Sequence, residues 1–163
     1  MKKRILIAPL NWGLGHATRC IPIINALVNF NFEPIIASDG AALELLKKEF
    51  PELKFIELPS YNIEYSKKGS FIKLKLLKNT PKILKAIKVE HKIVQDVILK
   101  NKIDGIISDN RFGVYSKKIP SIYITHQLHV LSGNTTWLST KLHQKFINNY
   151  IESILPNHYL MLK

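Results

Sequence analysis

The fold of this chain is decided by residues 5–19, which read Ile5-Leu6-Ile7-Ala8-Pro9-Leu10-Asn11-Trp12-Gly13-Leu14-Gly15-His16-Ala17-Thr18-Arg19. The apolar run at its start predicts a strand that is buried on both faces of a parallel sheet. Apolar residues between Cys20 and Phe30 then recur near helical spacing. Because Pro22 lacks an amide N–H, we expect it in the first turn of a helix that begins between Ala17 and Ile21. The stretch therefore predicts a strand, a glycine loop and a helix.

The rest of the chain repeats this alternation. Apolar runs predict further strands over residues 34–40, 103–109 and 120–125, and alternation of apolar and polar residues predicts one over residues 53–58. Helical spacing predicts a short helix over residues 41–50. We expect Pro81 to separate two helices, the second running from Lys82 to Lys100. A last helix is predicted over residues 137–155, with a sixth strand over residues 158–163. The order predicts one α/β domain over residues 1–163, a Rossmann-like, doubly wound parallel sheet in three α/β/α layers.

Length and composition agree with one globular domain. The chain has 163 residues, of which 46% are hydrophobic and 22% are charged, enough apolar material for a sizeable core. Its apolar runs are too short to span a membrane or to form a secretory signal, so we expect a cytoplasmic protein. Cys20 is the single cysteine, so no internal disulfide can form.

The chain is strongly basic. Lys and Arg number 24 against 12 Asp and Glu, for a net charge of +12, which favours anionic partners. Nine lysines and one acid, Glu90, lie between Lys67 and Lys92. One interpretation is a solvated helix face; the other is peripheral attachment to anionic lipid. The second would use six membrane-facing residues: Lys67, Lys68, Phe71, Lys73, Lys75 and Lys78. We assign no nucleic-acid partner.

The glycine loop is the first candidate site. Gly13 and Gly15 let the backbone approach a ligand closely, and free amides at a helix start favour a developing negative charge. His16 is the titratable side chain there, and a histidine suits general-base chemistry near neutral pH. The alternative is a structural or capping histidine.

A different class of protein also fits this loop. A dinucleotide fingerprint would need a third glycine where Thr18 stands, but Asp39 closes the second predicted strand where an acid that binds a ribose would lie. The alternative hypothesis is therefore a nucleotide-binding or NAD(P)-binding module without transferase activity.

Three stretches resemble GT-B glycosyltransferases, in particular the family of the peptidoglycan N-acetylglucosaminyltransferase that glycosylates a lipid-linked muramyl peptide. Residues 13–19, Gly-Leu-Gly-His-Ala-Thr-Arg, resemble the opening loop of that family. His126 and Gln127 match two positions of its His-Glu-Gln-Asn signature, although the intervening Glu is missing. Residues 108–113 resemble another loop of the group. The resemblance implies an inverting transferase that needs no metal and no cofactor other than its nucleotide-sugar donor, a UDP-sugar.

The resemblance also implies roles for particular residues. It makes His16 the catalytic base beside the acceptor. Three interpretations of Asp109 stay open: it orients a histidine, it binds an acceptor hydroxyl, or it only forms a turn. The polar clusters follow the carboxyl ends of the predicted strands, where parallel sheets bind ligands. The acceptor-binding residues expected there are Gly13, Gly15, Thr18, Arg19, Asp109, Asn110, Arg111, His126 and Gln127.

GT-B enzymes resemble one another in placing the sugar nucleotide on a second Rossmann-like domain. By this resemblance the chain is the N-terminal half, which binds a sugar or lipid-linked acceptor, and a C-terminal donor-binding domain lies outside it. We therefore expect the chain alone to bind a nucleotide sugar weakly and to lack turnover. Its exposed donor-facing surface would favour self-association.

Overall fold

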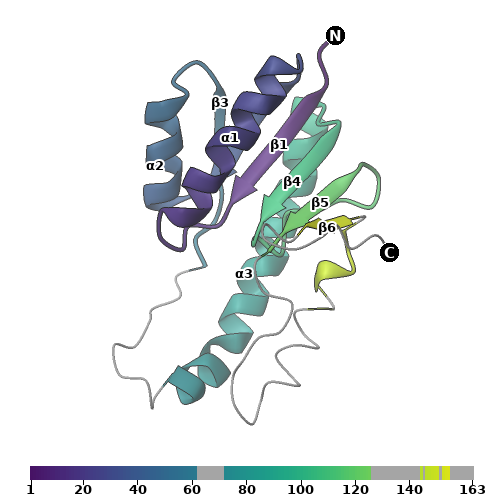
Figure 1. The fold of residues 1–163 in the computed structure, drawn as a ribbon. Helices are drawn as coiled ribbons and strands as arrows, with labels where there is room; N and C mark the ends of the chain where they lie inside the picture. Colours follow the sequence, from purple (N-terminus) through teal and green to yellow (C-terminus); the bar gives the residue numbers. More distant parts are fainter. Residues whose placement is uncertain (62–71, 126–143, 145, 151, 155–163) are drawn as a thin grey trace.

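Six parallel strands form the centre of the computed structural model, which describes residues 1–61, 72–125, 144, 146–150 and 152–154. Their order across the sheet is β3-β2-β1-β4-β5-β6 (Figure 1). The strands are β1 (Arg4–Pro9), β2 (Glu33–Ser38), β3 (Lys54–Glu57), β4 (Gly105–Asp109), β5 (Ser121–Ile124) and β6 (Glu152–Ile154). This order places β1 between β2 and β4, as in a doubly wound sheet, so the predicted Rossmann-like α/β fold is confirmed.

In the described part of the chain, the helices α1 (Gly15–Asn29), α2 (Gly40–Glu49) and α3 (Ile72–Asn101) cover the sheet. The helices α1 and α2 lie on one face, and α3 lies on the other (Figure 1). The chain therefore has the expected three layers. In the described part of the chain, no helix is both long and apolar enough to cross a membrane.

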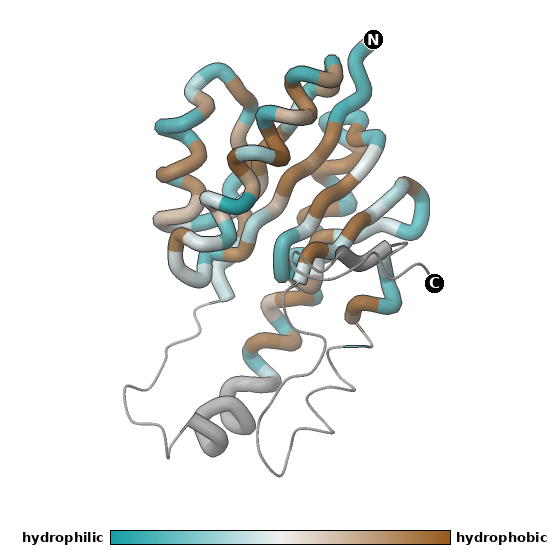
Figure 2. The backbone as a smooth tube through the Cα atoms, in the orientation of Figure 1, coloured by the Kyte–Doolittle hydropathy of each residue, from teal (hydrophilic) through white to brown (hydrophobic). Residues whose placement is uncertain are grey.

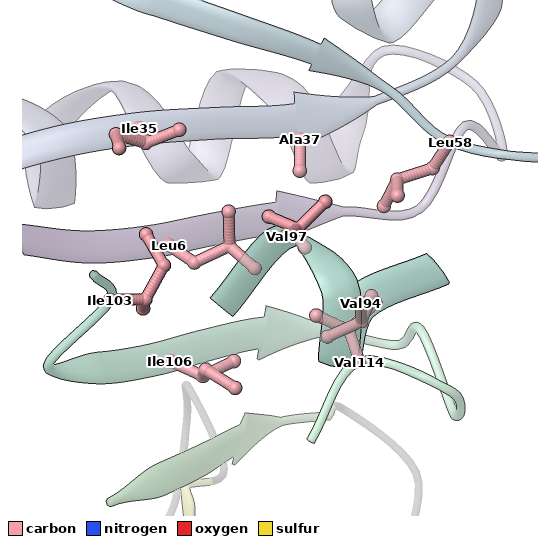
Figure 3. Packing of buried hydrophobic residues seen from close by; sticks show 10 residues of the cluster. Leu6, Ile35, Ala37, Leu58, Val94, Val97, Ile103, Ile106 and Val114 are labelled. Carbon is pink, nitrogen blue, oxygen red and sulfur yellow. The ribbon is translucent and has the colours of Figure 1, made fainter. Parts of the chain in front are cut away.

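Successive residues of the central strands pack into opposite cores, because side chains alternate across a strand. Leu6 and Ile35 face α3, where Val94 and Val97 complete the core shown in Figure 3. Ile7 packs with α1 and α2 on the opposite face. Both faces of β1 are thus buried from Leu6 to Pro9, which explains why the strand is apolar after Arg4, as the hydropathy colouring of Figure 2 also shows.

Two helices end in residues with left-handed backbone. Asn31 has φ of 63° after α1, and Lys102 has φ of 52° after α3. In each case the next amide bonds back to a carbonyl of the last turn, Phe32 to Leu27 at 2.9 Å and Ile103 to Ile98 at 3.1 Å. This arrangement is typical of a Schellman ending, in which otherwise unpaired carbonyls are satisfied.

Both predictions based on proline are wrong. The helix α1 begins at Gly15, so Pro22 lies well inside it and not in its first turn. Similarly, α3 is one helix of 30 residues with Pro81 inside it. A proline removes one intrahelical hydrogen bond, and this loss is smaller than the cost of starting a second helix.

The helix predicted over residues 137–155 is wrong at its end, whereas the described residues 144, 146 and 147 are helical. Residues 152–154, assigned to a helix, form β6 and pair with β5, so that Ile154 lies beside Ile124. The open edge of β5 supplies backbone donors and acceptors that a helix would leave unpaired. The strand predicted over residues 158–163 lies outside the described residues.

Candidate functional site

Polar residues from three strands meet at one edge of the sheet. His16 follows β1, Asp39 follows β2, and Asp109 is the last residue of β4. These strands are neighbours in the sheet, and parallel strands bring their carboxyl ends to the same edge. The predicted grouping of these polar clusters is therefore confirmed as geometry. The first turns of α1 place His16 and Arg19 on the side of this edge that faces Asp109.

His16, Arg19 and Asp109 form a compact charged cluster. Nδ1 of His16 lies 2.9 Å from Oδ1 of Asp109. Arg19 donates to the same carboxylate twice, from Nε to Oδ2 at 2.9 Å and from Nη2 to Oδ1 at 2.6 Å. Asp109 is completely buried and His16 is 8% exposed, whereas the side chain of Arg19 is 26% exposed. The carboxylate of Asp109 therefore contacts His16 and Arg19, which is the geometry that an orienting role needs; its predicted roles stay predictions.

Two groups of the cluster contact Nδ1 of His16. Nη2 of Arg19 also lies 2.9 Å from Nδ1, so Nη2, Nδ1 and Oδ1 form a nearly equilateral triangle. The tautomer of the ring decides the direction of these contacts. With a proton on Nδ1, the imidazole donates to Asp109 and its lone pair lies on Nε2, as a general base requires. With the proton on Nε2, Nδ1 accepts from Arg19.

The loop beside this cluster is open. Gly13 has φ of 72°, which favours glycine, and a Cβ added at Gly13 or Gly15 would meet no atom within 4 Å. Two large apolar side chains are exposed there, Trp12 at 42% and Leu14 at 50%. Thr18 is exposed and donates to the carbonyl of Gly15 at 3.2 Å. The loop therefore offers both space and apolar surface next to His16.

A second charged cluster, centred on Arg111, is entirely internal. The Arg111 guanidinium is 0% exposed. It donates to Oε1 of Glu90 at 2.6 Å, to Oδ1 of Asp39 at 2.5 Å and to the carbonyl of Pro59 at 2.7 Å. Tyr61 donates to the other oxygen of Glu90 and lies under the guanidinium, 5.4 Å from ring centroid to Cζ. This cluster ties the ends of β2, β3 and β4 to α3.

The pKa of Arg111 agrees with its contacts to two carboxylates. Burial by itself would lower the pKa of the guanidinium, but Glu90 and Asp39 raise the pKa above its usual value. The side chain is therefore charged and fully paired. The guanidinium is buried and donates to three protein partners, and the predicted contact of Arg111 with an acceptor stays a prediction.

The contacts of Asp39 do not agree with the ribose-binding role that the NAD(P)-binding hypothesis gives it. Its carboxylate accepts from Arg111 and from Asn11, the latter at 3.3 Å. The residue is only 5% exposed. A carboxylate held in this way is turned to the protein and not to a ribose. The NAD(P)-binding hypothesis thus loses the acidic residue on which it depended.

Asn110 follows the end of β4, and its amide donates to the carbonyl of Ile124 at the end of β5 at 3.1 Å. Asn110 has φ of 60° and accepts from Tyr123 Oη at 3.2 Å. Its predicted contact with an acceptor stays a prediction. His126, Gln127, Lys67, Lys68 and Phe71 lie outside the described residues. The backbone of Lys73, Lys75 and Lys78 belongs to α3, but their side chains are not described.

Sequence reasoning missed Glu90 and Tyr61 as parts of the buried network. Glu90 is completely buried and accepts from Arg111, Tyr61 and the amide of Gly113. The signal that was available is that Glu90 is the single acid in a run of nine lysines. Within the described residues, no three His, Cys, Asp or Glu side chains gather as metal ligands do.

Comparison with solved structures identifies proteins with a similar fold. MurG from Acinetobacter baumannii matches 98% of the chain over 43% of its own length, at 13% identity and a TM-score of 0.53. The glycosyltransferase SsfS6 of Streptomyces sp. SF2575, solved with thymidine diphosphate, matches 95% of the chain over 50% of its own, at 12% identity and a TM-score of 0.55. A protein assigned as a UDP-N-acetylglucosamine 2-epimerase from Listeria monocytogenes matches 96% of the chain over 39% of its own length, at 11% identity and a TM-score of 0.58.

These matches define the class of fold, an α/β Rossmann-like domain of the kind found in GT-B glycosyltransferases, and the resemblance predicted from the glycine loop is confirmed at that level. The chain spans half or less of the length of each of the three proteins. No protein-family model and no curated protein matches the sequence. At these identities the likeness describes the fold, and the reaction has to be argued from the site.

Proposed function

We propose that this chain is the acceptor-binding half of a glycosyltransferase that moves a sugar from a nucleotide-sugar donor to a hydroxyl group. The observation that carries the proposal is the pairing of His16 with the buried carboxylate of Asp109 beside an open glycine loop. A transferase needs a neutral, oriented base at the acceptor. The named transferases with the same fold, such as SsfS6 with its thymidine diphosphate, agree with a nucleotide-sugar donor.

The reaction follows from this geometry. Nε2 of His16 takes the proton of the acceptor hydroxyl while that oxygen bonds to the anomeric carbon of the donor sugar. The bond between this carbon and the nucleoside diphosphate breaks, and the diphosphate leaves with the electron pair. The imidazolium that forms is stabilised by the Asp109 carboxylate, since an opposite charge at hydrogen-bond distance favours the charged form. Arg19 and Asp109 act through His16, and a donor-binding domain outside this chain would hold the nucleotide.

The acceptor class is the finer part of the proposal. The exposed side chains of Trp12 and Leu14 offer apolar surface next to His16, which suits an acceptor with an apolar part, such as a lipid-linked sugar. The net charge of +12 favours approach to an anionic membrane surface, where such acceptors lie. The lysines between Lys67 and Lys92 are the candidates for that contact.

Ligand binding to the chain tests the proposal. Isotope-labelled protein is titrated with UDP-sugars, NAD and soluble sugar acceptors while backbone amide signals are followed. We expect acceptors to shift the signals of Gly13, Gly15 and Thr18, and we expect UDP-sugars to bind weakly. Tight binding of NAD at the glycine loop would contradict the proposal in favour of the NAD(P)-binding hypothesis.

An assay of products is needed as well, because the fold is shared with the protein assigned as an epimerase. A protein that joins this chain to a donor-binding domain is supplied with UDP-N-acetylglucosamine, with and without an acceptor. Transfer that depends on the acceptor supports the proposal. Inversion at C2 of the donor sugar in the absence of any acceptor would contradict it.

A further inference from the structure

We propose that Arg19 is a positioning residue that allows Asp109 to orient His16 without protonating it. The inference rests on the proposed function of His16 as a base. It assigns to Arg19 a task different from the acceptor contact expected from sequence, because its guanidinium is directed at Asp109 and His16. The residue would set the protonation state of the base without touching the reacting atoms.

The need for such a residue follows from the burial of Asp109. A completely buried carboxylate 2.9 Å from an imidazole favours the imidazolium form. An imidazolium has no lone pair and cannot accept the proton of an acceptor hydroxyl. With Asp109 alone, His16 would be well oriented, but the carboxylate would favour its charged form. Orientation and basicity are therefore in conflict at this site unless another group offsets the carboxylate.

Arg19 offsets it in two ways. Its bidentate bonds to both oxygens of Asp109, at 2.9 and 2.6 Å, neutralise the carboxylate. The same guanidinium lies 2.9 Å from Nδ1 of His16, where its positive charge opposes a second positive charge on the ring. With a neutral imidazole the cluster has one positive and one negative charge. Protonation would leave an excess positive charge in a mostly buried place, which is costly.

The other titratable groups at this corner do not replace Arg19. Among the described residues, Cys20 is the nearest on α1, and burial raises the pKa of its thiol, so that it stays neutral. On β2, the carboxylate of Asp39 is bonded to Arg111 and Asn11. Arg111 itself is held by Glu90 and Asp39. Arg19 is thus the cation that shares a carboxylate with His16.

The experiment is a titration of the His16 imidazole by NMR on the chain itself, comparing the wild type with Arg19→Gln and Asp109→Asn. We expect His16 in Arg19→Gln to become half protonated at a pH at least about one unit above the wild type, a tenfold gain in proton affinity. In Asp109→Asn the midpoint should move to lower pH. The double variant should lie between the two single variants.

Arg4→Gln is the matched control, because it also removes one arginine from an ion pair, that with Glu33 at the amino end of β1. Its His16 midpoint should equal that of the wild type. A midpoint in Arg19→Gln no different from that in Arg4→Gln would overturn the inference. If Arg19→Gln does not fold, Arg19→Lys and Asp109→Asn carry the test: Lys keeps the charge and should hold the midpoint near that of the wild type, whereas a rise of about one unit would contradict the inference.

The pH dependence of transferase activity separates this inference from the proposed function. In a protein that includes the donor domain, Arg19→Gln should lose activity at neutral pH and regain it as the pH rises, because His16 is deprotonated there. A structural defect would lower activity at every pH. If the midpoints shift as expected and no variant transfers sugar, the role of Arg19 toward His16 stands and the proposed function fails.

Discussion

Nδ1 of His16 lies 2.9 Å from Oδ1 of Asp109, although 93 positions separate the two residues in the chain. The contact joins the start of α1 to the end of β4, two elements that meet because β1 and β4 are neighbours in the sheet. It orients the imidazole, and a proton on Nδ1 that is donated to Asp109 leaves the lone pair on Nε2. The relationship makes His16 the residue whose loss should affect chemistry most.

His16→Ala should lower kcat of a protein that carries the donor domain by roughly 10² to 10⁴, the usual contribution of a general base. Binding of the nucleotide sugar should be nearly unchanged, because the proposed role of His16 is in the chemical step. Steady-state kinetics and calorimetry measure the two quantities. His91→Ala is the matched control, since His91 bonds to the carbonyl of Gly113 and stacks on Tyr115. Near-normal turnover of His16→Ala would remove the assignment.

Arg111→Met should destabilise the fold by about 3–5 kcal/mol, because Glu90 and Asp39 would be left as buried, uncompensated charges. Urea denaturation measures the loss. The matched control is Arg4→Met, which breaks a half-exposed pair with Glu33 and should cost no more than about 1 kcal/mol. Adding Glu90→Gln to Arg111→Met should recover part of the stability. Equal losses in the two arginine variants would show that the buried network is not a major source of stability.

Alkaline pH should destabilise the protein through its buried tyrosines. Burial raises the pKa of Tyr123 and Tyr150 well above the usual value, whereas unfolded tyrosine loses its proton near pH 10. Above about pH 10 the folded state therefore binds more protons than the unfolded state, so stability falls as pH rises. Each tyrosine contributes up to about 1.4 kcal/mol per pH unit in that range.

Tyr150→Phe tests this dependence. In this variant the free energy of unfolding should fall less steeply with rising pH, by about the contribution of one tyrosine. Urea denaturation between pH 8 and 11 measures it (roughly the window about the pKa of tyrosine). At neutral pH it should cost about 1 kcal/mol, because Tyr150 donates to the carbonyl of Arg111 at 2.7 Å. An unchanged slope in Tyr150→Phe would contradict the prediction.

Two glycines near the site should respond differently to alanine. Gly40 has φ of 51°, and an added Cβ would clash with Nδ2 of Asn11, so Gly40→Ala should cost about 1–3 kcal/mol. Gly15 opens α1 with free space around it, so Gly15→Ala should change stability by no more than about 0.5 kcal/mol. Thermal denaturation compares them. If Gly15 lies under the acceptor, Gly15→Ala should still weaken acceptor binding; unchanged binding would move the acceptor away from this loop.

Vesicle binding tests the lysine-rich section. Each lysine near an anionic bilayer contributes about 1 kcal/mol, so replacement of three by glutamate should reduce binding to phosphatidylserine vesicles by at least tenfold. Sedimentation at low and high salt measures it, and binding should weaken as salt rises. The residues replaced are Lys73, Lys75 and Lys78.

The control for charge alone replaces three exposed lysines elsewhere, Lys2, Lys48 and Lys54, by glutamate. This variant should retain most of the binding if the effect is local. Equal losses in the two variants would indicate attraction by net charge only. Equal binding of the wild type to neutral and anionic vesicles would support the solvated-face interpretation.

Local patterns in the sequence were sufficient for most of the architecture. The strands β1, β2, β4 and β5 were predicted from apolar runs, since a strand buried on both faces is largely apolar. The strand β3 was predicted from its alternation of apolar and polar residues. Proline misled the prediction of α1 and α3, because a proline's effect on a helix depends on the packing that holds the helix on either side. Residues 152–154 carry a helical apolar spacing with Tyr150, but the exposed edge of β5 made them a strand.

By itself, the sequence determined the α/β class, the glycine loop and the presence of polar residues at the strand ends, because each depends on residues close together in the chain. Only the tertiary structure decided which of those polar residues are partners. His16 pairs with Asp109, and Arg111 pairs with Glu90 and Asp39 across 21 and 72 positions. Such pairing depends on burial, since a charge removed from water needs an opposite charge at hydrogen-bond distance. That distance exists only after the sheet has brought the ends of its strands together.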